Sequence, residues 1–393
     1  MRRPGTSAGV VVLAVVIAAL AAIRLLAVED WDPTVFTAFG EEEPMTLEYA
    51  QQKLGREVVT RPAQGHDGKF FFVQANDPWL LHPEDNAEIM DRPIYRSQRM
   101  LYPVIVGVGG LLPSGAIVWT MVLANIAFMA VGSWAVARIG EKHGVSAWVG
   151  VAFAMNVGLL SELFIDGAGI VAFSLACLGG WALEDNRPLL AALALTGSAL
   201  TREVMLAFIA FVALFWLIRR KEVAWRVFLP PLAAVALWAI YVRLRIDIPG
   251  DIPQVREVTL VPFSGMANAL TSGRALLVDY LVIVFFSTLL VVVPFRAWRS
   301  ELYLTWGAVG FAVLGPFLTV YVWQKSFDIS RALAPLITVF IVELVLARQR
   351  RLASPLLVNK RTGVRCRSGL HCRNSGDHQA ERVHRLDTDQ GRP

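Results

Sequence analysis

The stretch that decides the fold class runs from Gly9 to Val28 and reads GVVVLAVVIAALAAIRLLAV. It is apolar except for Arg24, and about 20 helical residues at 1.5 Å each span the roughly 30 Å hydrocarbon core of a bilayer. A signal peptide would also place a basic start before an apolar run. Because the run is long and has no clear small-x-small cleavage site, we expect a first transmembrane helix here.

The rest of the chain repeats this pattern. Of its 393 residues, 55% are hydrophobic and 18% are charged, whereas soluble domains carry about 25% charged residues. The apolar residues lie in long runs between short charged loops, which predicts an all-α integral membrane protein and excludes a disordered or simple soluble one. About ten transmembrane helices are expected, at residues 9–28, 115–137, 147–163, 167–183, 189–200, 203–218, 225–243, 276–294, 301–322 and 331–347.

Basic residues orient these helices, because short cytoplasmic loops collect Lys and Arg. With the N-terminus inside, the cytoplasmic segments hold 14 basic residues and the short outer segments hold seven. We therefore expect a multi-pass protein of the plasma membrane with both termini cytoplasmic and a long first extracytoplasmic loop at 29–114. The apolar segment Leu101–Leu112 is too short to span the bilayer, and we interpret it as an interfacial or re-entrant helix.

The chain divides into a transmembrane domain at 1–347 and a basic cytoplasmic tail at 348–393, which is expected to be disordered. The tail has 11 basic and four acidic residues, whereas residues 29–100 have seven basic and 14 acidic residues. The net charge of +5 is therefore a signal of topology and of contact with anionic lipid, and it gives no support for nucleic-acid binding. Three cysteines are too few for a disulfide framework, and the spacing of Cys366 and Cys372 matches no common zinc pattern.

The outer loop contains the main candidate for chemistry, Asp67, within Gly-His-Asp-Gly-Lys-Phe-Phe-Phe at 65–72. Glycines on both sides allow unusual backbone geometry and close approach of a ligand, and the three phenylalanines are expected in the headgroup layer. The alternative is that Asp-Gly merely forms a turn.

Other polar residues are expected on the same membrane face. Each alone could be explained by snorkelling or a simple ion pair, but together they indicate an outward-facing polar site. The sequence has no His-Glu-x-x-His or Cys/His zinc pattern and no Gly-x-Ser-x-Gly elbow. A carboxylate base opposite arginines suits a displacement in which a hydroxyl loses its proton as a phosphate leaves, and a lipid-linked phosphate would explain the membrane location. The polar residues expected on this membrane face are Glu162, Asp166, Arg202, Glu203, Lys325, Asp328 and Arg331, together with Arg96 and Arg99, which precede the interfacial segment.

Over residues 9–347 the chain resembles the GT-C superfamily of polytopic glycosyltransferases. The 65–72 segment looks like the Tyr/Trp-Asp-Gly-x-x-Tyr stretch in the first outer loop of GPI mannosyltransferase II-like proteins and their bacterial relatives. The runs Tyr95–Pro103, Leu200–Glu203 and Ser326–Arg331 also look like the bacterial branch. The resemblance implies transfer of a sugar, as by a hexosyl- or mannosyltransferase, from a polyprenyl-phosphate donor on the extracytoplasmic face, usually with inversion, and interfacial helices in the first loop. Two departures are that His66 replaces the usual aromatic residue and that no second acid adjoins Asp67.

The resulting hypothesis is a bacterial GT-C-type glycosyltransferase of cell-envelope glycopolymer biosynthesis, which transfers the sugar to a glycan or lipid-linked acceptor. Asp67 aligns with the family's catalytic base. Arg96, Arg99, Arg202 and Arg331 are expected to bind the donor phosphate, Asp166 and Glu203 to orient sugar hydroxyls or the arginines, and His66 and Lys325 to contact substrate. No metal or cofactor is expected. The alternatives are a transporter or flippase of lipid-linked saccharides and a non-catalytic membrane scaffold.

Overall fold

The computed structural model describes residues 6–221, 224–247, 258–273 and 276–361. The chain forms two compact units, Met1–Glu343 and Leu344–Pro393. The described part of the second unit is the remainder of the last helix, α20. All contacts discussed below lie within the first unit.

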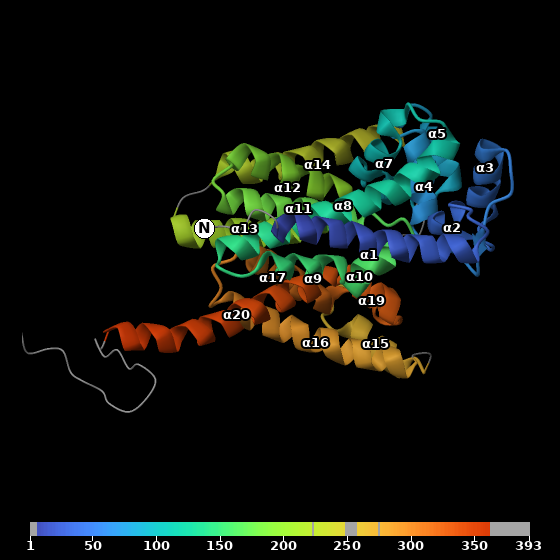
Figure 1. Ribbon diagram of the computed structural model, residues 1–393. Coiled ribbons are helices and arrows are strands. Elements are labelled where there is room, and N and C mark those ends of the chain that lie inside the picture. The colour runs from blue at the N-terminus through green and yellow to red at the C-terminus, as the bar shows by residue number, and fades with distance from the viewer. Residues whose placement is uncertain (1–5, 222–223, 248–257, 274–275, 362–393) are drawn as a thin grey trace, which may run out of the picture. The chain divides into compact units, whose positions relative to one another are not determined.

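The first unit is built almost entirely from helices (Figure 1). The longer helices are α1 (Thr6–Val28), α8 (Ser114–Lys142), α11 (Gly169–Glu184), α12 (Pro188–Thr201), α13 (Met205–Arg220), α14 (Trp225–Arg245), α16 (Leu277–Ala297), α17 (Tyr303–Leu314) and α20 (Ala334–Arg361). The outer loop carries α2 (Thr34–Thr37), α3 (Pro44–Leu54), α4 (Gly68–Asn76), α5 (Pro83–Ile89), α6 (Pro93–Ser97), α7 (Leu101–Val106), η1 (Val108–Gly110) and the parallel strands β1 (Phe39–Gly40) and β2 (Thr60–Arg61). The other short helices are η2 (Ala147–Gly150), α9 (Val151–Ala154), α10 (Val157–Leu163), α15 (Ser264–Thr271), η3 (Gly315–Phe317), α18 (Val320–Trp323) and α19 (Ser326–Ala332).

Four of the described helices, α1, α8, α14 and α16, are long and apolar enough to cross a membrane. A fifth candidate arises if α19 and α20, which meet at a 66° bend, count as one span. The chain is therefore a helical protein of membrane type. Helices α11, α12 and α17 are apolar but shorter, and two predicted runs are broken: 147–163 into η2, α9 and α10, and 301–322 into α17, η3 and α18.

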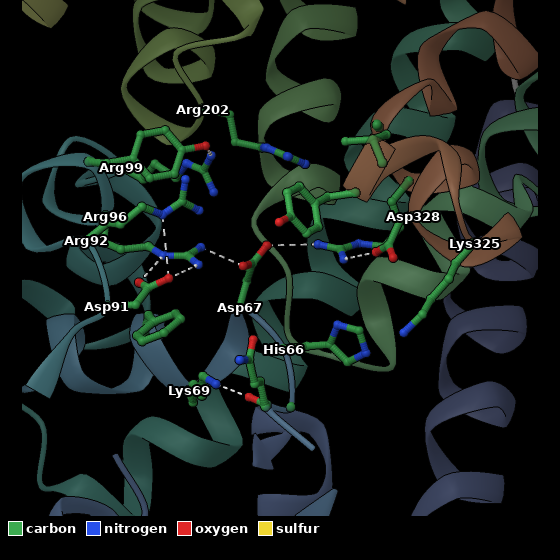
Figure 2. A pocket seen from close by; sticks show the side chains of 18 of the residues that line it. His66, Asp67, Lys69, Asp91, Arg92, Arg96, Arg99, Arg202, Lys325 and Asp328 are labelled. Atoms are coloured by element: carbon green, nitrogen blue, oxygen red, sulfur yellow. Dashed lines mark hydrogen bonds and ion pairs between the residues drawn. The ribbon is translucent and has the colours of Figure 1, made fainter. Parts of the chain in front are cut away.

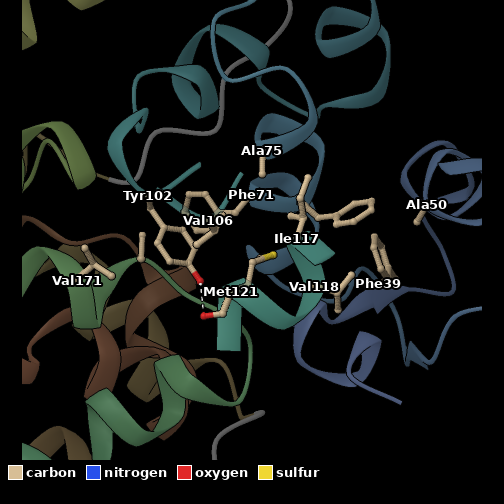
Figure 3. Packing of buried hydrophobic residues seen from close by; sticks show 12 residues of the cluster. Phe39, Ala50, Phe71, Ala75, Tyr102, Val106, Ile117, Val118, Met121 and Val171 are labelled. Carbon is tan, nitrogen blue, oxygen red and sulfur yellow. Dashed lines mark hydrogen bonds between the residues drawn. The ribbon is translucent and has the colours of Figure 1, made fainter. Parts of the chain in front are cut away.

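Residues 29–113 form a group of short helices at one end of the bundle, beside the end of α1 and the start of α8 (Figure 1). Their core joins the outer loop to α8: Phe71 meets Tyr102 edge to face at 5.2 Å, and both belong to a cluster with Ile117 and Met121 (Figure 3). The expectation that Phe70–Phe72 lie in the headgroup layer is wrong, because all three rings are buried inside the protein. Burial there removes more of their apolar surface from water than a position in the headgroup layer would.

The segment Leu101–Leu112, which was expected to be an interfacial or re-entrant helix, contains only short helices. Its helical part is the six-residue α7, followed by η1. Gly107 ends α7 against α4, where a Cβ would overlap the carbonyl oxygen of Ala75. The chain then turns back into α8 without crossing the bundle, so this segment does not count as a span.

Helix α14 holds the outer loop through three side chains that all donate to backbone carbonyls. Trp238 donates its indole N–H to the Ser97 carbonyl at 2.8 Å, and Tyr241 donates its hydroxyl to the Trp79 carbonyl at 2.6 Å. Arg245 donates to the Leu80 carbonyl at 2.6 and 3.0 Å. The Trp238 bond holds the end of α6, which carries Arg96, and the other two side chains hold the segment between α4 and α5.

The expected disordered tail at 348–393 begins as helix, because α20 continues to Arg361. Residues 347–353 (ARQRRLA) are strong helix formers with no glycine or proline, and they extend the apolar helix before them. The remaining tail, with Cys366 and Cys372, lies outside the described residues.

Gly68 provides a test of the outer-loop packing. A Cβ at this position would overlap the Ile165 carbonyl oxygen and lie 2.8 Å from that of Thr37, so backbone would have to move. We expect Gly68→Ala to lower the free energy of unfolding by about 1–3 kcal/mol, the usual cost of overpacking, measured by thermal unfolding of the detergent-solubilised protein. Gly115→Ala is the control, because a Cβ there has no neighbour within 4 Å; equal melting temperatures for the two variants would contradict this packing.

Candidate active site

A cavity of about 1040 Å³ lies between the outer loop, the α12–α13 junction and the α17–α19 segment. Eight of the nine residues to which the sequence assigned a catalytic or substrate-binding role line it. These are His66, Asp67, Arg96, Arg99, Arg202, Glu203, Lys325 and Arg331. The ninth, Asp166, does not.

The backbone before α4 presents Asp67 to this cavity. The His66 amide donates to the Ala38 carbonyl at 3.0 Å. Gly65 has φ +65°, a backbone conformation that is unfavourable for residues with a Cβ. Asp67 has helical backbone angles, φ −60° and ψ −27°, and directly precedes α4 without capping it. Asp67-Gly68 is thus a helix start rather than a hairpin turn. Gly68 makes room for protein backbone rather than for a ligand.

Two arginines from distant parts of the chain hold the Asp67 carboxylate. Arg96 Nη1 lies 2.6 Å from Oδ1, and Arg331 Nη2 lies 3.0 Å from Oδ2 (Figure 2). Burial raises the pKa of Asp67, but the positive charges of Arg96 and Arg331 outweigh it and hold the pKa well below its usual value. The carboxylate is therefore ionised at neutral pH and at mildly acidic pH.

The wall around Arg96 consists of paired charges and aromatic rings. Arg96 also binds Asp91 at 2.9 and 3.1 Å and lies over the Phe70 ring at 4.3 Å. Arg99 makes a two-pronged pair with Glu203 at 3.1 and 3.2 Å, a geometry that fixes a guanidinium plane. Glu203 was expected to orient either sugar hydroxyls or the arginines, and in the structure it contacts an arginine.

Behind the opposite wall lies Glu162, which does not line the cavity and is 1% exposed. Its Oε1 accepts from Arg331 Nε at 3.1 Å and from Arg202 Nη1 at 3.0 Å. Arg331 also pairs with Asp328 at 3.2 Å. Arg331 therefore bridges the carboxylate inside the cavity and the carboxylate behind it.

Two lining cations keep unused donors. The buried Nε of Arg202 has no hydrogen-bond partner. The side chain of Lys325 is exposed and lines the cavity, and among the described residues its ammonium group has no ion pair or hydrogen bond. These donors remain available to an anionic ligand.

His66 stands in the cavity with its ring 5.1 Å from that of Phe327. Burial, and then the positive charge of Arg331, lowers the pKa of the His66 imidazole to about 4. His66 is therefore a neutral ring at physiological pH.

Asp166 is placed apart from the arginines, contrary to its expected role. It is fully buried, and its nearest donor is Asn125 Nδ2 at 3.4 Å, which also donates to the Tyr102 hydroxyl at 3.0 Å. The backbone turns at Asp166, where φ is +45°. This turn directs the following glycines, and not Asp166, toward Glu162.

Several lining residues were missing from the expected set. The missed polar residues include Asp91, Arg92 and Tyr95. Basic residues recur nearby at 92, 96 and 99, a spacing that predicts one helical face, and this signal could have identified them as part of the site. No such signal marks the apolar lining, because its members resemble ordinary membrane-helix residues. They include Val204, Val258, Leu314, Leu318, Tyr321 and Val322.

The described residues contain no group of three or more His, Cys, Asp or Glu that could hold a metal ion. Comparisons with models of protein families, with curated proteins and with solved structures found no match to this chain. The functional argument therefore depends on the chemistry of the cavity.

The state of His66 can be measured directly. We expect its imidazole to remain neutral from pH 8 down to about 5, because its pKa is about 4, and in Arg331→Gln the pKa should rise because a neighbouring cation is lost. The measurement is a ¹⁵N-histidine NMR titration, with His66→Asn used to assign the signal. An inflection near pH 6.5 in the wild-type protein would contradict this environment.

Proposed function

We propose that this chain is a membrane glycosyltransferase that moves a sugar from a polyprenyl-phosphate donor to a cell-envelope acceptor on the extracytoplasmic face. One observation carries the proposal: a carboxylate lies between two guanidiniums in a cavity that also has apolar lining residues. Cations suit a phosphate, and the apolar lining suits the first units of a prenyl chain. The proposal includes about ten spans with both termini inside, which requires α11, α12, α13, α17 and the broken segment of η2, α9 and α10 to cross as well.

In the proposed reaction Asp67 accepts the proton of an acceptor hydroxyl as that oxygen attacks the anomeric carbon. The bond from this carbon to the phosphate oxygen breaks, its electron pair stays on the phosphate, and polyprenyl phosphate leaves with inversion at the sugar. Arg202 and Lys325, whose donors are not fully used, bind the leaving phosphate, where negative charge develops. Arg99 is held by Glu203 and shapes the same wall.

The low pKa of Asp67 makes it a weak base in the structure without donor. A bound phosphate competes with Asp67 for Arg96 and Arg331, because both anions attract the same guanidiniums. As these bonds loosen, the proton affinity of Asp67 rises. Donor binding therefore activates the base, and premature protonation of Asp67 is disfavoured before the donor arrives.

Two alternatives predict different outcomes. A transporter or flippase of lipid-linked saccharides would move the donor across proteoliposomes without cleaving it, and transporters place substrate charges near the bilayer midplane. A scaffold that binds partners through residues 29–100 would tolerate loss of charge at Asp67 and Arg331. Release of polyprenyl phosphate coupled to glycosylation distinguishes transfer from both.

Asp67→Asn tests the base. Proteoliposomes receive polyprenyl-phosphate [¹⁴C]mannose, or its glucose or galactose form, with solubilised cell-envelope glycans and glycolipids as acceptors. We expect the variant to lose at least about 100-fold in transfer, the effect typical of a group required in the transition state. The control is Asp32→Asn in the same loop, since Asp32 also pairs with an arginine, Arg56, but does not line the cavity. Wild-type transfer by Asp67→Asn at equal expression, or translocation without cleavage, would overturn the proposal.

Lys325→Met tests the phosphate contact. Loss of this unpaired cation should raise the donor KM about tenfold, which corresponds to about 1.4 kcal/mol, and leave the acceptor KM unchanged. Lys53→Met is the matched control, because Lys53 lies over the Tyr49 ring on α3, away from the cavity. If both variants kept the wild-type donor KM, Lys325 would not contact the phosphate.

A further inference from the structure

We propose that Glu162 is a positioning residue of the transfer site: it holds Arg202 and Arg331 from behind and limits how tightly Arg331 binds Asp67. This inference rests on the proposed function but concerns a residue outside the cavity. Glu162 lies on α10, and its side chain does not line the cavity.

The first support is the complete set of bonds to this carboxylate. Both guanidiniums reach Oε1, at 3.0 and 3.1 Å, and the Gly169 amide donates to Oε2 at 3.0 Å. Each oxygen therefore has a fixed partner, which leaves the carboxylate one orientation. A buried charge held in this way costs less than an unpaired one, and it sets the direction of both arginines.

The second support is the chain that wraps Glu162. A Cβ at Gly167 would overlap its Oε2, and a Cβ at Gly169 would lie 2.7 Å from its carboxyl carbon. The Gly167 amide also donates to the Glu162 carbonyl at 2.8 Å. Two glycines thus allow backbone to enclose the carboxylate, where side chains would push it away.

The third support is the contact of α10 with α19, which carries Arg331, and with α20, which follows it. A Cβ at Gly158 would overlap the Ser330 carbonyl oxygen, so α10 and α19 touch through backbone. Asn156, just before α10, donates to the Ala334 carbonyl at 2.7 Å and to the Thr338 hydroxyl at 2.9 Å. Glu162 and Arg331 therefore keep their relative position.

These contacts give Glu162 a role that a folding contact lacks. Arg331 divides its donors between Asp67 and Glu162. Without the Glu162 charge, the Arg331 guanidinium can direct all its donors to Asp67. Arg331 then binds the base more tightly and no longer contacts the phosphate. Net positive charge around the phosphate increases at the same time, so donor binding need not weaken. The expected signature is lost turnover with retained donor binding.

The test compares Glu162→Gln with the wild-type chain in proteoliposomes. Bound [³H]polyprenyl phosphate is counted, and transfer is measured with whichever labelled mannose, glucose or galactose donor the wild-type chain uses. For Glu162→Gln we expect kcat per bound lipid to fall about 10–100-fold, the range typical of residues that orient functional side chains, with donor KM within about threefold of wild type. Glu162→Asp keeps the charge and should recover part of kcat, and Gly169→Ala should lower kcat in the same way as Glu162→Gln.

The matched control is Glu343→Gln. Glu343 is another buried carboxylate of the same unit, but it accepts from the hydroxyls of Ser300 and Thr305 and does not line the cavity. We expect it to keep the wild-type kcat per bound lipid even if the amount of folded protein falls.

The outcomes separate the two proposals. A wild-type chain that transfers sugar, with Glu162→Gln equal to it per bound lipid, overturns only the role of Glu162. Transfer and lipid binding that fall in equal proportion would make Glu162 a folding residue and also overturn its role. A wild-type chain that transfers no sugar overturns the proposed function, and the inference fails with it.

Discussion

The arrangement of the cavity depends on one guanidinium, that of Arg331. It pairs with Asp67, which lies 264 residues earlier, and with Glu162, 169 residues earlier. Charges taken out of water are costly unless they are paired, so the three helices that supply these groups are constrained together. The outer loop, α10 and α19 must therefore assemble as one body, and the cavity is the space that remains between them.

This pairing also sets the chemistry of the cavity. A carboxylate between two arginines is ionised but weakly basic, and its reactivity depends on what else attracts those arginines. An anionic lipid does so, whereas a neutral sugar does not. In the proposed function, proton transfer is linked to the presence of a phosphate without a moving lid, because the same hydrogen-bond donors serve both anions in turn.

The sequence predicted the helical class and eight of the lining residues because helix ends with the same parity are expected on one membrane face. Arg96, Arg202 and Lys325 belong to segments far apart in the chain, yet this rule places them together. It could not state which carboxylate pairs with which arginine, since several lie at the same depth. Asp166 was misassigned because a single positive φ turns it inward. The burial of Phe71 and Phe72 depends on Tyr102 and α8, which the local sequence pattern does not encode.

The contacts of α14 with the outer loop have a consequence for how this protein can vary. The hydrogen bonds that Trp238, Tyr241 and Arg245 donate to the outer loop all end on main-chain oxygens, those of residues 79, 80, 81 and 97. Every amino acid offers the same carbonyl, so exposed positions such as Leu81 can change without loss of these bonds. In the proposed function, side chains of the outer loop can therefore change to suit different acceptors while the three α14 residues keep the loop backbone in place.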